Sequence, residues 1–224
     1  MERAILDQLY EVLQENMIIP VHQSAYQKLH STETALCKIY NDLVISTCQG
    51  QTSLLILLDL SAAFDTVDHE ILKEDLFHCR VQDSALALLK SYLEDRYQQV
   101  VIGKAMSEPS LLHCGVPQGS VLGPILFLVY THSLASLLAS HGVEGHFYAD
   151  DCQIYLPIAN IDETKTKVLA LLSDIKIWMS RRKLKLNENK TEIMLVKGNM
   201  RTNVVCDFGD LNVGASTLNP VDSV

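Results

Sequence analysis

The stretch Phe147–Leu156 reads Phe-Tyr-Ala-Asp-Asp-Cys-Gln-Ile-Tyr-Leu and places two carboxylates side by side in an apolar, aromatic run. The flanking residues are strong strand formers, whereas two adjacent aspartates are unfavourable in the middle of a strand. We therefore expect a hairpin with Asp150 and Asp151 at its tip. Like charges this close hinder each other's ionisation, and a divalent cation that binds both removes the repulsion. A simple turn without a metal is the alternative that this stretch alone leaves open.

A third aspartate follows a strongly apolar run. The run is Ser53–Leu58, and Asp59 comes directly after it. A strand this apolar has both faces covered, and an aspartate at its end needs a partner. If this strand lies beside the hairpin, Asp59 meets Asp150 and Asp151. Three carboxylates at one point can hold two magnesium ions about 3.5–4 Å apart, an arrangement used in phosphoryl transfer.

The stretch Gly115–Pro124 is rich in glycine and proline and leads into an apolar helix. We expect this helix to run from Ile125 to about Ser140 and to be closed by Gly142. A glycine-rich loop that opens a helix allows close approach and offers free N–H groups to a phosphate. A tight turn followed by a proline-started helix is the alternative reading.

Composition and charge separate classes of function. The 224 residues suffice for one well-packed core or one domain with an appendage. The net charge of −9 and the pI of about 5.3 count against a complete nucleic-acid enzyme, whose binding surface should be basic. A basic surface must then be local or lie on segments outside this chain.

The cysteines and the first residues bear on location. The six cysteines include no Cys-x-x-Cys pair, which favours reduced thiols over a disulfide framework or a zinc site. No apolar run is expected to reach the roughly 18 residues that span a bilayer, and Met1-Glu2-Arg3 lacks a signal-peptide pattern. We expect an intracellular protein, in the nucleus or cytoplasm, that is not secreted and does not enter a membrane.

The remaining sequence predicts alternating helices and strands. Helices are expected from Ile5 to before Pro20, from the cap Ser31 to near Gly50, and from a cap at Asp65 or Thr66 to about His78. Further elements are expected at Asp83–Asp95 (helix), Gln98–Gly103 (strand), after the capping pair Asn160 and Glu163 (helix) and at Glu192–Val196 (strand). The pattern fades after Gly198, so residues 198–224 are expected to form a poorly ordered tail.

Four of these segments, in this order, resemble the palm motifs of the reverse transcriptase of non-LTR, LINE-type retrotransposons. They are Leu57–His69, Gly115–Pro124, Tyr148–Asp151, and Leu184–Asn187 with Lys190–Glu192. Upstream, Gln23–Tyr26 and His30–Leu36 resemble segments on the fingers side of that family. The similarity extends from Glu2 to about Val196, and four motifs in order are far more specific than any one of them.

The resemblance implies an α+β fold with right-hand reverse transcriptase architecture. A helical, partial fingers region would occupy residues 1–50, and a palm with an antiparallel sheet backed by helices would occupy 51–197. The implied activity is RNA-directed DNA polymerisation, in which deoxynucleotides (dNTPs) are joined to a DNA primer on an RNA template. The implied cofactor is Mg²⁺, with Mn²⁺ as a possible substitute.

The resemblance also implies roles for single residues near the metal. Asp59, Asp150 and Asp151 would be the catalytic metal ligands, and the carbonyl of Leu60 could add a further ligand. Lys190 resembles the family's candidate proton donor to pyrophosphate, although a lysine in a turn is an equally good reading.

On the nucleotide side, Phe64 would lie under the incoming sugar and exclude a 2′-hydroxyl, the group that separates RNA from DNA building blocks. Core packing is the other reading of this ring, and one ring can do both. Three further residues, Ala63, Gln118 and Gly119, would contact the nucleotide. Pro117 and Tyr148 would contact the template or primer.

Some positions depart from the family pattern. Gln27 stands where many relatives have arginine, and Cys152 stands where threonine is usual. The resemblance implies a chain that stops before the primer grip and thumb, that is, a truncated palm with part of the fingers. A catalytically inactive remnant that acts at most as a binding module is therefore the alternative function. A nucleotide cyclase on a related fold is weaker, because the Pro117–Gly119 loop and Phe64 have no obvious use there.

Overall fold

The computed structural model describes residues 1–187, 190–197, 211–213, 216–218 and 221–222. The chain forms two compact units, one of Met1–Ile19 with Ala62–His132 and one of Pro20–Ser61 with Ser133–Val224. These boundaries differ from a division near residue 50, and the names fingers and palm for the predicted ranges stay predictions. The predicted tail lies mostly outside the described residues, but the structure has the short strands β11 (Leu211–Val213), β12 (Ser216–Leu218) and β13 (Val221–Asp222) within it.

The second unit is built around a largely antiparallel sheet with the strand order β13-β10-β1-β8-β7. The central strand β1 (Thr52–Leu58) pairs antiparallel with both β8 (Asp151–Ile158) and β10 (Glu192–Val196), and β8 pairs with β7 (Glu144–Tyr148). Only β13 runs parallel to its neighbour among the described strands of this sheet. The pairing of the strand before Asp59 with the Asp-Asp hairpin, a hypothesis from the sequence, is confirmed.

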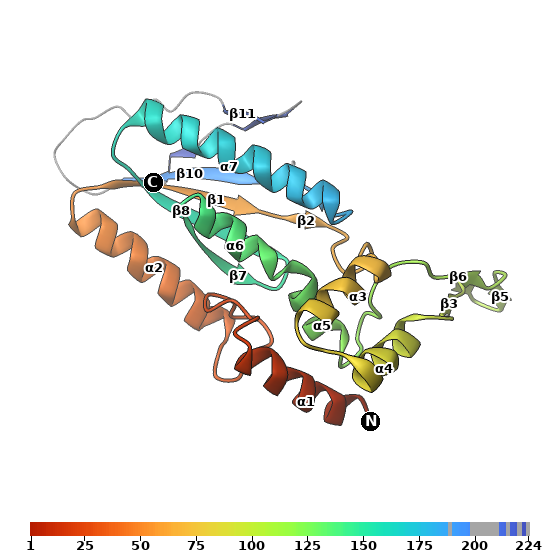
Figure 1. Ribbon diagram of the computed structural model, residues 1–224. Helices are drawn as coiled ribbons and strands as arrows, with labels where there is room; N and C mark the ends of the chain where they lie inside the picture. The colour runs from red at the N-terminus through yellow and green to blue at the C-terminus, as the bar shows by residue number, and fades with distance from the viewer. Residues whose placement is uncertain (188–189, 198–210, 214–215, 219–220, 223–224) are drawn as a thin grey trace. The chain divides into compact units, whose positions relative to one another are not determined.

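Helices cover both faces of this sheet, as expected for a strand as apolar as β1. Opposite residues in an antiparallel pair share a face, and the buried residues Ile56, Ile154 and Gly145 lie opposite one another on β1, β8 and β7. A Cβ on Gly145 would meet Leu138 of α6 (Ser133–Ser140), so this face packs against α6, which contacts α7 (Ile161–Arg181). On the other face, Ser53 meets α2 (Thr32–Cys48), because its hydroxyl oxygen lies 2.7 Å from that of Ser46 (Figure 1). The predicted α+β class, with an antiparallel sheet backed by helices, is confirmed.

Two of the helices in this unit begin at the predicted caps. The Ser31 side chain accepts from the amide of Thr34, which completes a capping box at the start of α2. The Asn160 side chain accepts from the amide of Glu163 at the start of α7, 3.2 Å away. Both caps satisfy amides that have no partner inside the helix.

The first unit is helical, with α1 (Glu2–Glu15), α3 (His69–His78), α4 (Asp83–Leu93) and α5 (Gly123–Thr131). Its core is made of large side chains that are fully buried: Leu13, Leu72, Leu76, Leu93, Leu122, Leu126, Phe127 and Tyr130. Two short strand pairs, β3 (Tyr97–Gln98) with β6 (Ser110–Leu111) and β4 (Val101–Ile102) with β5 (Ala105–Met106), form a hairpin between α4 and the glycine-rich stretch. The single strand expected at Gln98–Gly103 is therefore wrong, since the paired segments are shorter and interrupted.

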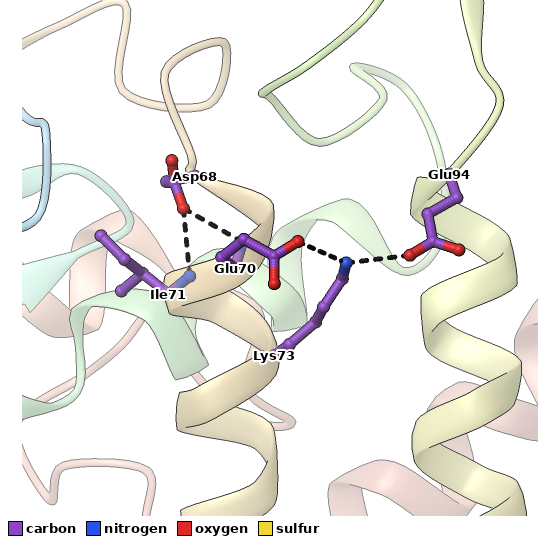
Figure 2. Close-up of polar contacts among 5 residues, drawn as sticks. All are labelled: Asp68, Glu70, Ile71, Lys73 and Glu94. Carbon is purple, nitrogen blue, oxygen red and sulfur yellow. Dashed lines mark hydrogen bonds and ion pairs between the residues drawn. The ribbon is translucent and has the colours of Figure 1, made fainter.

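Helix α3 starts later than the sequence predicted. Asp68, and not Asp65 or Thr66, is its cap, with Oδ1 accepting from the amides of Glu70 and Ile71 at 3.0 and 3.1 Å (Figure 2). The preceding residues form a turn instead, in which the amide of Thr66 donates to the carbonyl of Ala62. The φ angle of Ala62 is +48°.

Lys73 joins α3 to the end of α4. Its Nζ donates to Oε1 of Glu70 at 2.8 Å and to Oε1 of Glu94 at 2.9 Å (Figure 2). The lysine side chain is 11% exposed, whereas both glutamates are far more exposed. One partly buried cation therefore holds two acidic side chains from different elements.

The apolar helix after Pro124 is divided, contrary to the prediction of one helix from Ile125 to Ser140. Helix α5 ends at Thr131 and α6 begins at Ser133. Nδ1 of His132 lies 2.6 Å from the carbonyl oxygen of Val129, an acceptor that an uninterrupted helix would give to the amide of Ser133. The expected closing glycine, Gly142, has φ +60°.

The same region is apolar enough to pass a test for a membrane span. The window Gly123–Ser140 has 18 residues and a mean hydropathy of 1.4, so the expectation that no apolar run reaches this length is wrong for this window. Half of the window is buried, and the core helix of a soluble protein passes the same test.

Candidate active site

The register of β1 and β8 brings Asp59 to the start of the Asp-Asp strand. Leu58 pairs with Cys152, so the next residues along the two antiparallel strands are Asp59 and Asp151. Tyr148 pairs with Asp151 across the hairpin, which leaves Ala149 and Asp150 in the turn between β7 and β8. The predicted hairpin is confirmed, and the three aspartates lie at the same end of the sheet.

A cavity of about 410 Å³ opens at this end of the sheet. It is lined by Leu57, Leu58, Asp59, Asp151, Cys152, Gln153, Lys190 and Glu192. Nζ of Lys190 is 3.9 Å from Oδ2 of Asp59, whose side chain is 25% exposed. The cavity therefore combines the carboxylates of Asp59, Asp151 and Glu192 with one cation, and Asp150 is not among the residues that line it.

Burial and the neighbouring charges shift the pKa of the Asp151 carboxyl group. Partial burial raises the pKa of its carboxyl group, and the negative charges of Asp150 and Asp59 raise it further. Lys190 opposes this effect because its positive charge lowers the same pKa. The ionised carboxylates repel one another, so a bound cation would stabilise their charged forms.

The donor set fits a hard divalent cation. Magnesium commonly takes one or two protein carboxylates and completes its shell with water and phosphate oxygens. Asp59 and Asp151 supply two such carboxylates to one cavity. Among the residues that the structure describes, no three His, Cys, Asp or Glu side chains form a group that could hold a metal ion. The three aspartates thus share one end of the sheet without forming a closed three-carboxylate cage.

Asn187 fixes the strand end that carries Asp59. Its Nδ2 donates to Oδ2 of Asp59 at 2.8 Å, and its backbone amide donates to the carbonyl oxygen of Asp59 at 2.9 Å. Its own carbonyl accepts from the amides of Lys190 and Thr191. Asn187 belongs to the fourth motif, but the sequence predicts no role for it. Nothing in the residues around Asn187 indicates a bond to Asp59, which lies 128 positions earlier.

Two more predicted site residues belong to this unit. Leu60 is buried and pairs with Leu186 where β2 (Leu60–Ser61) meets β9 (Lys185–Leu186). Tyr148 is half-buried at the end of β7. The metal-ligand role of the Leu60 carbonyl and the template or primer role of Tyr148 stay predictions.

The predicted nucleotide-side residues belong to the first unit, where the structure brings them together. The amide of Val116 donates to the carbonyl of Phe64 at 2.9 Å, and the Phe64 ring stacks on Phe127 with centroids 4.4 Å apart. Nε2 of Gln118 donates to Oδ1 of Asp65 at 2.9 Å. The residues predicted to contact nucleotide or template, Ala63, Phe64, Pro117, Gln118 and Gly119, thus lie on two segments that are joined by hydrogen bonds.

Glycine conformation explains why this loop needs its sequence. Gly115 has φ +89°, and a Cβ at this position would lie 2.9 Å from the carbonyl oxygen of Asp65. Gly119 has φ +77° with open space around it. Side chains are disfavoured at both positions, at Gly115 by contact as well as by conformation. The alternative reading as a tight turn before a proline-started helix describes this geometry, and binding of a phosphate stays a prediction.

Comparison with known proteins identifies the family. The family model described as "Reverse transcriptase (RNA-dependent DNA polymerase)" matches residues 1–215. The chain is 31% identical over 198 residues to the probable RNA-directed DNA polymerase from transposon BS of Drosophila melanogaster, covering 85% of this chain and 21% of that protein. It is 27% identical over 197 residues to the polymerase from mobile element jockey of the same organism, again covering 85% and 21%.

Solved structures agree on the fold. Telomerase from Candida tropicalis, determined with a fragment of telomeric RNA, has a TM-score of 0.65 at 16% identity, covering 95% of this chain and 36% of that one. A second structure, the apo enzyme truncated from its C-terminal domain, gives 0.62 at 15% identity, with 90% and 40% covered. This likeness confirms the predicted α+β reverse transcriptase fold.

The chain spans about one fifth of the length of these polymerase relatives. The retrotransposon resemblance seen in the four motifs is confirmed by relatives that are polymerases of mobile elements. The chain therefore belongs to the reverse transcriptase (RNA-dependent DNA polymerase) family and is related to the polymerases of non-LTR, LINE-type retrotransposons.

Proposed function

We propose that this domain extends a DNA primer on an RNA template, using deoxynucleoside triphosphates and Mg²⁺, with Mn²⁺ as a substitute. The observation that carries the proposal is the pair of carboxylates, Asp59 and Asp151, that face one cavity across the β1–β8 register. Membership of the reverse transcriptase family supports the same chemistry.

The primer 3′-hydroxyl loses its proton to water, its oxygen bonds to the α-phosphorus of the nucleotide, and the bond from this phosphorus to the oxygen shared with the β-phosphate breaks, so that pyrophosphate leaves. Divalent ions, when bound, would favour loss of the 3′-hydroxyl proton and neutralise the leaving group. We propose that the ionised carboxylates of Asp59, Asp150 and Asp151 bind these metal ions. Asn187 orients Asp59, since it bonds both the carboxylate and the backbone of that residue.

Lys190 is the proposed proton donor to pyrophosphate. Its ammonium group lies 3.9 Å from Asp59 and lines the same cavity. The side chain is 70% exposed, so it can turn towards a substrate without first leaving a buried site. A second effect supports the same assignment: its charge lowers the pKa of Asp151 and so favours the ionised carboxylate.

For the nucleotide we propose a surface formed by Ala63, Phe64, Gln118 and Gly119, with Pro117 and Tyr148 against the template or primer. The stacking of Phe64 on Phe127 supports a fixed ring that would exclude a 2′-hydroxyl.

The cysteines among the described residues are free, which supports the proposal of a reducing, intracellular location.

The test is primer extension on an RNA template by the unchanged chain, Asp151→Asn and Asp162→Asn. Asp162 is exposed in the first turn of α7, in the same unit, and serves as the matched control. We expect Asp151→Asn to lower the rate at least about a hundredfold, equal to about 2.7 kcal/mol of barrier, and Asp162→Asn to leave it unchanged. No extension by the unchanged chain, or equal extension by all three proteins, would contradict the proposal.

A further inference from the structure

The segment that contains Gln23–Tyr26 has no part in the proposed chemistry, yet it is bonded to the strand that leads into the Asp-Asp turn. The amide of Phe147 donates to the carbonyl of His22, and the amide of Ser24 donates to the carbonyl of Phe147, both at 2.9 Å. Gln23 and Phe147 form a parallel bridge. The segment therefore extends the sheet beyond β7 by a short stretch of backbone pairing.

The side chain of Gln23 reaches past this pairing to the turn itself. Gln23 is 3% exposed, and its Oε1 accepts from the amide of Ala25 at 2.9 Å and from the amide of Ala149 at 3.3 Å. Its carbonyl oxygen accepts from Nε2 of Gln27 at 2.7 Å. The buried side-chain oxygen of Gln23 thus accepts from two backbone amides and links the segment directly to Ala149, the residue before Asp150.

Ala149 needs such support because of its backbone conformation. Its φ is +58°, in the left-handed region that residues with a Cβ rarely adopt. A residue held in this region persists when the surrounding structure fixes it. The side-chain oxygen of Gln23 takes the amide of Ala149, and the pairing of Phe147 fixes the strand before it.

We propose that Gln23 is a positioning residue that holds the turn at Ala149 so that Asp150 and Asp151 are presented for divalent cation binding. The catalytic meaning of this role rests on the proposed function, whereas the effect on the turn does not. Gln23 acts on the two aspartates through the backbone of Ala149.

The chain offers a matched control for this proposal in the neighbouring residue. Ser24 is 4% exposed, and its hydroxyl lies 2.9 Å from Nε2 of His146. Ser24→Ala removes a buried side-chain contact from the same segment but leaves the amide of Ala149 untouched. A loss of stability without a loss of cation binding is therefore expected for this variant.

The chain also offers a suppressor. Glycine adopts positive φ without the penalty that a Cβ brings. If Gln23 acts by holding Ala149 in this conformation, Ala149→Gly should make the turn less dependent on Gln23. The two substitutions should then be non-additive, as expected for groups in direct contact.

The experiment measures Mn²⁺ affinity by electron paramagnetic resonance, together with thermal unfolding, for the unchanged chain, Gln23→Ala, Ser24→Ala, Ala149→Gly and the double variant Gln23→Ala/Ala149→Gly. We expect Gln23→Ala to weaken Mn²⁺ binding roughly tenfold, the lower end of the effect of losing a group that orients metal ligands. Ser24→Ala should keep the parent affinity even where its melting temperature falls. The double variant should bind within about threefold of Ala149→Gly, since glycine makes the hydrogen bond less necessary.

Three outcomes would overturn the proposal: parent-like affinity in Gln23→Ala, an equal loss in Ser24→Ala, or an undiminished effect of Gln23→Ala beside Gly at position 149. Primer extension by the same proteins separates this result from the fate of the proposed function. If the unchanged chain fails to extend primers while Gln23→Ala still weakens Mn²⁺ binding, the polymerase proposal fails and the role of Gln23 stands.

Discussion

The two compact units each carry some of the predicted site residues and fix them by different means. In the second unit, strand register brings Asp59 and Asp151 together from positions far apart in the chain. In the first unit, the loop from Gly115 to Gly119 takes its shape from positive φ angles and from hydrogen bonds to the turn at Phe64. A sheet can align distant residues with ordinary backbone angles, whereas a loop of this kind depends on particular glycines.

The two regions also differ in how far their residues stabilise the folded chain. Around the aspartates, partial burial and then like charges raise the pKa of Asp151, and Ala149 takes a conformation unfavourable for alanine. In the first unit, Gln118 bonds Asp65 and the Phe64 ring stacks on Phe127. We infer that substitutions in the loop unit lower stability, whereas removing a charge at the carboxylate end raises it, as expected where function and stability conflict.

The largest stability effect is expected at Gly115. Replacing it with alanine would place a Cβ 2.9 Å from backbone oxygen at φ +89°, so we expect a loss of about 3 kcal/mol from contact and backbone strain together. Gly103 is the matched control, because it has φ +61° with no atom within 4 Å of the added Cβ. Gly103→Ala should lose only about 1 kcal/mol. Urea unfolding measures both, and equal losses would show that the close approach to Asp65 does not matter.

A smaller effect is expected from Lys73, in the same unit. Lys73→Met keeps most of the apolar stem but leaves Glu70 and Glu94 without their shared cation, so we expect a loss of about 1–2 kcal/mol. Lys90→Met removes an exposed charge of the same kind from α4 and should change stability by at most about 0.5 kcal/mol. If the two variants unfold at the same urea concentration, the bridge between α3 and α4 contributes nothing.

The smallest effect has the opposite sign and lies at the carboxylate end. The folded-state pKa of Asp151 is raised, so its ionisation lowers the free energy of unfolding from pH 3.8 upward, and the loss is complete once the pH exceeds the folded-state pKa. In the presence of a chelator, Asp151→Asn should therefore stabilise the chain at neutral pH, by less than about 1 kcal/mol because the group is exposed and screened. The gain should vanish as the pH falls below 3.8, the ordinary value for this group. If Asp151→Asn instead destabilised the chain at neutral pH, the proposed repulsion between Asp151 and the other two aspartates would be wrong.

Much of the carboxylate end could be predicted because its signals are local and strong. The apolar run before Asp59 predicted a strand covered on both faces, and the adjacent aspartates predicted a turn. Asp59 was then expected near Asp150 and Asp151 on the one assumption that this strand pairs with the hairpin. The caps Ser31 and Asn160 were found for the same reason, since a polar side chain three residues before the amide that donates to it leaves a visible pattern.

The features that escaped prediction depend on contacts between distant segments. Helix α3 begins at His69 and not near Thr66, because the turn before it is paired with the glycine-rich stretch through Phe64 and Val67. Gln23 and Asn187 bond residues more than a hundred positions away, and a single amide side chain carries no periodic signal. Side-chain positioning of this kind becomes visible only once the sheet has brought the segments together.

Mn²⁺ affinity in a double-mutant cycle tests whether Asp59 and Asp151 bind the same cation. The proteins are the unchanged chain, Asp59→Asn, Asp151→Asn and the double variant. Each single substitution should weaken binding at least about tenfold, and the double variant should lose clearly less than the product of the two, because ligands of one ion are coupled. Fully multiplicative losses, or parent-like affinity in either single variant, would contradict the shared site.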